Sequence, residues 1–221
     1  MFLRTSKNIK SLNLNEIICN RLVLENLYEN TTITSMNLCN IRDSFKSKAM
    51  DLLVKILYNN FTLTFLNLGS NQFESREMKV ILEVLYKNTT LNSLVLSNNQ
   101  IFGIEGGELL AKFLCKNTAL TSLNLNYNKL GPEGGKALAD ALCQNSTLTT
   151  LSLGQTNLGS EGGKALAIGL CKSSTLKELN LWDNELGSEG GKALANVLCT
   201  NSTLTTLYLG QNNLALKEEK P

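Results

Sequence analysis

Histidine is absent from this chain of 221 residues. Because histidine is the most common general base and the most common metal ligand, its absence argues against the usual designs of hydrolase and metal site. No cysteine pair has the C-x-x-C spacing of a zinc or redox motif. We therefore expect neither a metal nor a cofactor.

Charge is also sparse, with 18% charged residues and a formal net charge of +2. This balance gives no reason to expect nucleic acid or an acidic membrane as a partner. No apolar run reaches the roughly 18 residues that would cross a membrane. The first residues, MFLRTSKNIK, contain too short an apolar stretch for a secretory signal.

A leucine pattern fills nearly the whole chain. Each unit reads L-x-x-L-x-L-x-x-N-x-L, and its first leucine serves as an anchor; the anchors are Leu63, Leu91, Leu120, Leu148, Leu176 and Leu204. They lie 28 residues apart, except for 29 between Leu91 and Leu120, where we take Phe102 as the extra residue. Looser copies begin at Ile9 and Ile33, which makes eight predicted strands.

Each unit combines two periodicities. Leu123 and Leu125 alternate with polar residues, which predicts a half-buried strand. The string GGKALADALC that follows has apolar residues three and four apart, which predicts a helix of about a dozen residues with one buried face. Ser160 and Ser188 are predicted N-caps of such helices, and Pro132 stands where a helix start tolerates proline.

These units resemble the leucine-rich repeat proteins of the ribonuclease-inhibitor-like class, which also occur at the end of NOD-like receptors. The resemblance covers Ile9 to about Leu216. It implies an α/β solenoid, or horseshoe, of about eight repeats, with a parallel β-sheet on the concave face and α-helices on the convex face. We expect one domain over residues 1–221, with atypical repeats at 9–62, regular repeats at 63–203 and a truncated last repeat at 204–221. Helices need more room than strands, so stacked units bend toward the strands.

The string GSEGGKALA at Gly159–Ala167, repeated at Gly187–Ala195, is reminiscent of a phosphate-binding loop. The spacing from Gly159 to Gly163 is one residue short of that motif, and Ala165 replaces the Ser or Thr that would hold magnesium. We interpret the glycines instead as small residues that let neighbouring helices start close together.

Three polar columns recur with the units, and we interpret each as structural. The first comprises Asn71, Asn99, Asn128, Thr156, Asn184 and Asn212, with Ile17 and Ile41 in the first two units. The family resemblance implies that these side chains bond backbone groups of adjacent units, as a buried polar side chain requires. The second comprises the N-x-S/T sites Asn30, Asn60, Asn88, Asn145 and Asn201, which we interpret as turn residues rather than glycosylation sites.

The third column holds Cys115, Cys143, Cys171 and Cys199, each five residues before the next anchor. Tyr28, Tyr58 and Tyr86 occupy the same position in earlier units. Neighbouring helices lie about 8–10 Å apart, beyond the roughly 7 Å limit for a disulfide. We therefore predict buried, reduced and metal-free thiols, which favour a cytoplasmic protein.

Partner specificity is expected at the exposed strand positions, because the leucines are committed to the core. Most of these positions are small and polar, and the departures fall into two patches. One patch is Phe65 with Val95. The other contains Trp182 and Tyr208, flanked by Glu178 and Asp183, and Tyr127 occupies a related turn position. Tryptophan and tyrosine are enriched at binding hot spots, although ordinary surface variation would also produce such departures.

The sequence favours a non-catalytic scaffold that binds a protein partner on the concave face. A bacterial effector, delivered into a host cytoplasm, or an innate-sensor-like module would fit this description. A hydrolase using Glu178 and Asp183 is disfavoured, because an open sheet offers no pocket. The alternative function is a structural repeat protein that associates end to end.

Overall fold

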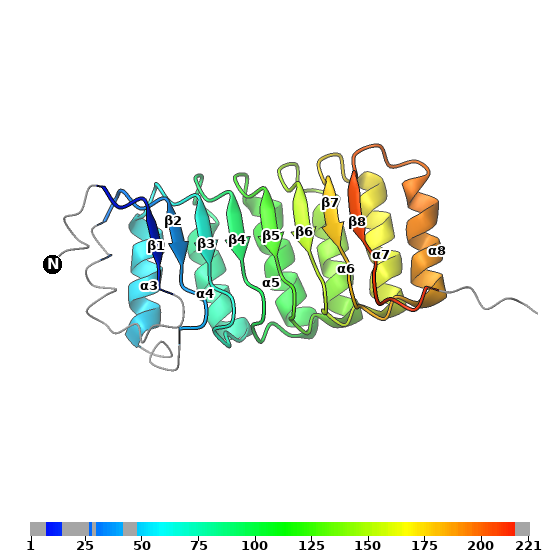
Figure 1. The fold of residues 1–221 in the computed structure, drawn as a ribbon, viewed down its shortest axis with the longest axis horizontal. Coiled ribbons are helices and arrows are strands. Elements are labelled where there is room, and N and C mark those ends of the chain that lie inside the picture. The colour runs from blue at the N-terminus through cyan, green and yellow to red at the C-terminus, as the bar shows by residue number, and fades with distance from the viewer. Residues whose placement is uncertain (1–7, 15–26, 28–29, 42–47, 215–221) are drawn as a thin grey trace, which may run out of the picture.

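The computed structural model describes residues 8–14, 27, 30–41 and 48–214 (Figure 1). Its strands are β1 (Ser11–Asn13), β2 (Ser35–Asn37), β3 (Phe65–Asn67), β4 (Ser93–Val95), β5 (Ser122–Asn124), β6 (Thr150–Ser152), β7 (Glu178–Asn180) and β8 (Thr206–Tyr208). All pair in parallel, in chain order, in one eight-stranded sheet. The predicted eight-strand parallel sheet is confirmed.

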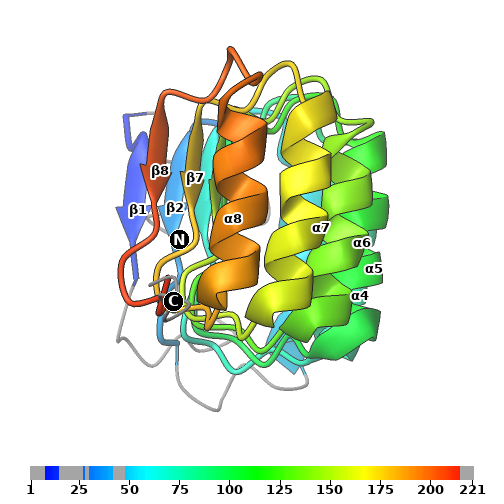
Figure 2. The ribbon, with the colours of Figure 1, turned by 90° about the vertical axis from the view of Figure 1, so that its right-hand side faces the viewer.

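A helix follows most strands and lies against one side of the sheet. The helices are α3 (Lys48–Asn59), α4 (Ser75–Leu85), α5 (Gly103–Lys116), α6 (Gly131–Leu142), α7 (Gly159–Lys172) and α8 (Gly187–Leu198). Figure 2 shows two layers, with the strands on one side and the helices on the other. The other side of the sheet, here called the open face, carries no helix of the described residues. None of the described helices is long and apolar enough to cross a membrane.

The core lies between the two layers and consists of the repeated leucines. In each regular strand the middle residue points inward and its two neighbours point to the open face, as in Ser122–Leu123–Asn124. Leu123, Leu125, Leu151 and Leu153 have no exposed surface. Burying such a side chain contributes roughly 1.5–3 kcal/mol, so the leucine column contributes strongly to the stability of the stacked units.

The asparagine column ties each unit to its neighbours, as expected. Asn128 donates from Nδ2 to the carbonyls of Leu96, in the preceding unit, at 3.0 Å and of Leu125, in its own unit, at 2.8 Å. Its Oδ1 accepts from the backbone N–H of Asn99 at 3.2 Å. Thr156 breaks the column, because its hydroxyl donates within its own unit to Leu153 at 2.6 Å. Ile41 is buried in the same column, and Ile17 lies outside the described residues.

The asparagines of the N-x-S/T sites form a second ladder at the other end of the strands. Asn145 accepts from the backbone N–H groups of Thr147 at 3.0 Å and Leu148 at 2.7 Å. Its Nδ2 donates to the Leu114 carbonyl in the previous unit at 2.7 Å. Asn201 repeats the arrangement with Leu204 and Leu170. These side chains are engaged in turn structure, which confirms their structural interpretation.

The strand-to-helix turns use left-handed backbone. Seven residues at one repeat position have φ between 52° and 60°: Asn40, Ser70, Asn98, Tyr127, Gln155, Asp183 and Gln211. Gly131, Gly159 and Gly187 then open their helices with positive φ. Pro132 stands in the first turn of α6, as expected. The N-cap prediction is wrong: Leu158 and Leu186 occupy the cap positions, which leaves Ser160 and Ser188 inside the first turn.

The paired glycines bring helices together, as predicted. A Cβ added to Gly107 of α5 would overlap the Cα of Gly134 in α6. At Gly135 it would lie 3.2 Å from the Cα of Gly162 in α7. These backbone contacts leave no room for a side chain. The glycines are therefore packing residues of the solenoid.

The expectation of buried cysteines is wrong. Cys115, Cys171 and Cys199 are exposed, and Cys143 is half-buried. The column lies at the ends of the helices, either in the last turn or directly after it, where Tyr58 is also exposed. The thiols are nevertheless free, as is that of Cys39. The sequence period correctly grouped these residues but did not indicate which side of the helix they occupy.

Candidate protein-binding face

Trp182 and Tyr208 lie near each other on the open face. Strand register pairs Asn180 of β7 with Tyr208 of β8, and Trp182 follows two residues after Asn180. Trp182 is 36% exposed and Tyr208 is 50% exposed. No ring contact joins them among the described residues. The tryptophan instead covers Gly210, because a Cβ there would lie 3.0 Å from its Cδ1.

The two flanking carboxylates occupy opposite ends of this patch. Glu178 pairs with Thr206 at the start of the strand and is half-buried. Asp183 lies at the turn after the strand, where its Oδ2 accepts from Nε2 of Gln155 at 2.6 Å. Four strand-like steps separate Glu178 from Trp182, or roughly 13 Å. The carboxylates therefore border the aromatic patch at two points and do not form a close acid–base pair.

Tyr127 belongs to a rim hollow that the sequence did not reveal. This hollow of about 360 Å³ is lined by Asn98, Tyr127, Asn128, Lys129, Gln155, Asn157, Asp183 and Glu185. Tyr127 is 52% exposed and has φ 59°, an unfavourable backbone conformation for a bulky side chain. The alignment of turn positions across units grouped Tyr127 with Asp183, but it gave no sign of a hollow between them.

Phe65 and Val95 form a separate and weaker patch. Phe65 pairs with Ser93, and Val95 pairs with Asn67, so the two residues are diagonal neighbours on β3 and β4. Both are half-buried. Three strand spacings separate β4 from β7, or roughly 14 Å. A partner would therefore need a broad footprint to contact both patches.

The described residues contain no group of three or more Cys, Asp or Glu side chains placed to hold a metal ion. Their exposed polar groups are spread along a sheet that is open to solvent. This arrangement suits recognition of another surface.

The repeat pattern is recognised by one family model. The model is described as "Leucine Rich repeat" and matches residues 59–76, 87–111, 116–139, 144–167 and 172–195. These segments cover more than half of the chain. The chain belongs to the leucine-rich repeat family. None of the curated proteins matches it.

Solved structures share this leucine-rich repeat fold. The leiomodin-1 actin-binding site 2 has 25% identity and a TM-score of 0.61, over 70% of this chain and 90% of that one. LegL7 from Legionella pneumophila has 24% identity and a TM-score of 0.62, over 91% of this chain and 65% of that one. The C-terminal domain of Caenorhabditis elegans tropomodulin has 14% identity and a TM-score of 0.56, over 69% and 92%. Leucine-rich repeats generally serve as binding scaffolds, and these structures share the fold of this chain.

Proposed function

We propose that this leucine-rich repeat chain is a non-catalytic scaffold that binds a protein partner on its open face, with Trp182 and Tyr208 as anchors. The observation that carries the proposal is the exposed aromatic patch over Gly210, on a face otherwise lined mainly by small polar residues. Glu178 and Asp183 border the patch and favour a partner that presents Lys or Arg around an apolar anchor. Tyr127 extends this surface to the rim, and Phe65 with Val95 forms its secondary patch.

Actin is the first partner to test. The leiomodin-1 domain, whose name describes an actin-binding site, is 25% identical over 70% of this chain. Affinity for monomeric actin should be measured for the parent chain and for Trp182→Ala and Tyr208→Ala. Each substitution should weaken binding by about 2 kcal/mol, or roughly 30-fold. Asn37→Ala, far along the same face, is the matched control.

Two outcomes count against the proposal. Unchanged affinity in both aromatic variants, with melting temperatures near that of the parent, would exclude this patch as the binding site. If actin does not bind, the candidate partners become those proteins that the parent chain captures and that neither aromatic variant captures. Equal capture by all three chains contradicts the proposal.

We also propose that the protein works in the cytoplasm, because the described cysteines are free thiols. A bacterial effector delivered into a host cell and an innate-sensor-like module are both consistent with this location. The alternative function, end-to-end association of copies, predicts a sedimentation coefficient that rises with protein concentration.

A further inference from the structure

The helix layer changes its spacing between the two halves of the molecule. The glycines Gly107, Gly135, Gly163 and Gly191 all lie thirteen residues before the next anchor, and Met50 and Met78 occupy that position in α3 and α4. Met78 is fully buried. Its side chain therefore occupies space that, where this position is glycine, the backbone of the neighbouring helix can enter. Accordingly, the backbones of α3 and α4 approach each other closely at fewer positions than those of α6 and α7 do.

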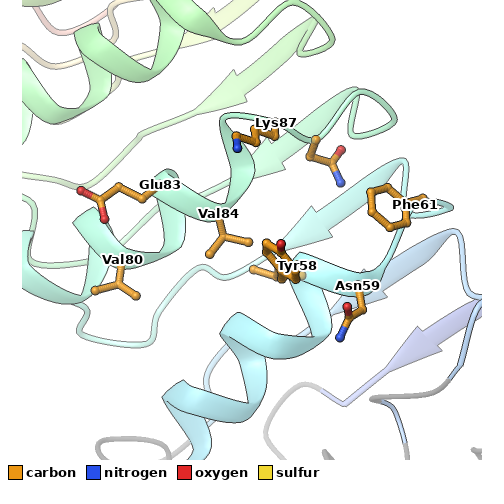
Figure 3. A pocket seen from close by; sticks show the side chains of 9 residues that line it. Tyr58, Asn59, Phe61, Val80, Glu83, Val84 and Lys87 are labelled. Atoms are coloured by element: carbon orange, nitrogen blue, oxygen red, sulfur yellow. The ribbon is translucent and has the colours of Figure 1, made fainter.

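An apolar groove lies on the helix side between these more widely spaced helices. The groove has a volume of about 390 Å³ and lies between the end of α3 and the outer side of α4 (Figure 3). Buried Leu57 contributes to its lining, together with Val80 and Val84 from α4. Tyr58 is 69% exposed and Phe61 is 68% exposed. Clustered exposed apolar side chains are a feature of interaction sites.

Two opposite charges lie along the α4 wall of the groove. Glu83 lies in the last turn of α4, and Lys87 lies in the turn directly after the helix, so the two charges follow one another along this wall. Among the described residues, neither makes an ion pair. A ligand that lies along the groove can therefore pair with both. The order of these charges distinguishes one ligand direction from the other.

We propose that this groove receives an amphipathic helix of a partner protein, running antiparallel to α3 and α4. The lining side chains come from two helices and the turn after α3, which matches recognition of a helix by a groove rather than addition of a strand to a sheet edge. In the antiparallel direction, the dipole of the partner helix points opposite to the dipoles of α3 and α4, which is the favourable arrangement. It also places an acidic residue of the partner at Lys87 and, four residues later, a basic residue at Glu83. That Glu-to-Lys order is the one that stabilises an isolated helix.

The probe is a fluorescent 16-residue peptide with leucines at helical spacing and, on the groove-facing edge, Glu followed four residues later by Lys. The control peptide exchanges that Glu and Lys. In anisotropy titrations of the full chain, the first peptide should bind about tenfold more tightly than the control. The double variant Glu83→Lys/Lys87→Glu should reverse the preference. This exchange keeps the apolar groove and the net charge unchanged.

Two further variants test the apolar contacts and the independence of this site. Tyr58→Ser should weaken both peptides at least tenfold, and because Tyr58 is mostly exposed, the melting temperature should stay near that of the parent. Trp182→Ala, on the other face of the molecule, should leave peptide binding unchanged. Equal affinity for the two peptides, or no binding by either at about 1 mM, would overturn the proposal without affecting the proposed function of the open face.

Discussion

The indole of Trp182 lies over the backbone of Gly210 in the next unit. A methyl group at Gly210 would lie 3.0 Å from Cδ1 and 3.4 Å from Nε1 of the indole. The exposed aromatic anchor thus depends on a glycine 28 residues away in sequence. This dependence can be tested directly, because the chain contains one tryptophan.

Gly210→Ala should displace the indole by a few tenths of an ångström and expose it further to water. The emission of Trp182 should therefore shift to longer wavelength, with little change in melting temperature. Gly69→Ala is the matched control, because Gly69 has the same repeat position on a distant unit. An identical emission spectrum in Gly210→Ala would show that the indole does not rest on this backbone.

Truncation of a core leucine should be costly. Leu123→Ala or Leu151→Ala is expected to lower the free energy of unfolding by about 2–5 kcal/mol, because each side chain is fully buried in the leucine column. Urea unfolding followed by circular dichroism measures this change. Leu198→Ala, at a 40% exposed helix position, serves as the comparison. A loss below roughly 0.5 kcal/mol at Leu123 would mean that this residue is not in the core.

Two glycines at the same repeat position should respond differently to alanine. At Gly107, the new methyl group meets the backbone of α6, so we expect a loss of about 1–3 kcal/mol. At Gly163, the shortest contact is 2.8 Å to Cδ2 of Leu186, a side-chain end that can rotate away. The helix propensity of alanine, worth about 1 kcal/mol over glycine, should then offset the cost. Equal destabilisation in chemical denaturation would contradict this difference in contacts.

Restoring the asparagine column should stabilise the protein. Thr156 is fully buried and lacks the amide that Asn128 uses to bond the preceding unit. Thr156→Asn should supply a bond to the Leu125 carbonyl and raise the free energy of unfolding by about 1 kcal/mol. Thr156→Val, which removes the hydroxyl, should lower it. A destabilised Thr156→Asn variant would show that the site cannot accommodate the ladder geometry.

Cys115 should react slowly for an exposed thiol. Burial, and then the nearby negative charge of Asp140, raise the pKa of Cys115. At pH 8, less thiolate is therefore available for alkylation. Asp140→Asn should lower that pKa and speed the labelling of Cys115, as measured by mass spectrometry of labelled peptides. The labelling rate of Cys199 in the same sample is the internal control. An unchanged labelling rate of Cys115 in the Asp140→Asn variant would show that Asp140 does not raise the pKa of this thiol.

The repeat spacing was sufficient to predict the eight strands, the helices between them and the turn role of Asn145. The parallel sheet and the role of Asn128 were implied by the resemblance to the leucine-rich repeat family. A regular spacing shows that residues share the same structural environment, but it does not show whether that environment is buried or exposed. This limit explains the error at Cys115 and Cys171, which are exposed near the ends of the helices. Tyr58 in the same column was a sign of this, because a position packed between closely spaced helices would not accommodate a tyrosine side chain.

The arrangement of the candidate site residues could be predicted in part. Placing Trp182 and Tyr208 two positions apart on adjacent strands required only the register. The contact with Gly210 and the rim hollow around Tyr127 could not be predicted in the same way, because they depend on side-chain direction and on left-handed turns. The groove between α3 and α4 did have a signal in the sequence. Met50 and Met78 replace glycine in these two helices, and the consequence for helix spacing became clear only in three dimensions.

The asparagine ladders have a consequence for how this molecule can evolve. Asn128 bonds both its own unit and the preceding one, and Asn145 bonds backward in the same manner at the other end of the strand. A duplicated segment of 28 residues would therefore contain its own ladder asparagines, and the units on either side would present the backbone groups to which they bond. The number of units, and with it the length of the open face, can change by whole steps without alteration of any existing unit. The identical strings Gly159–Ala167 and Gly187–Ala195 are what a recent duplication of this kind would leave.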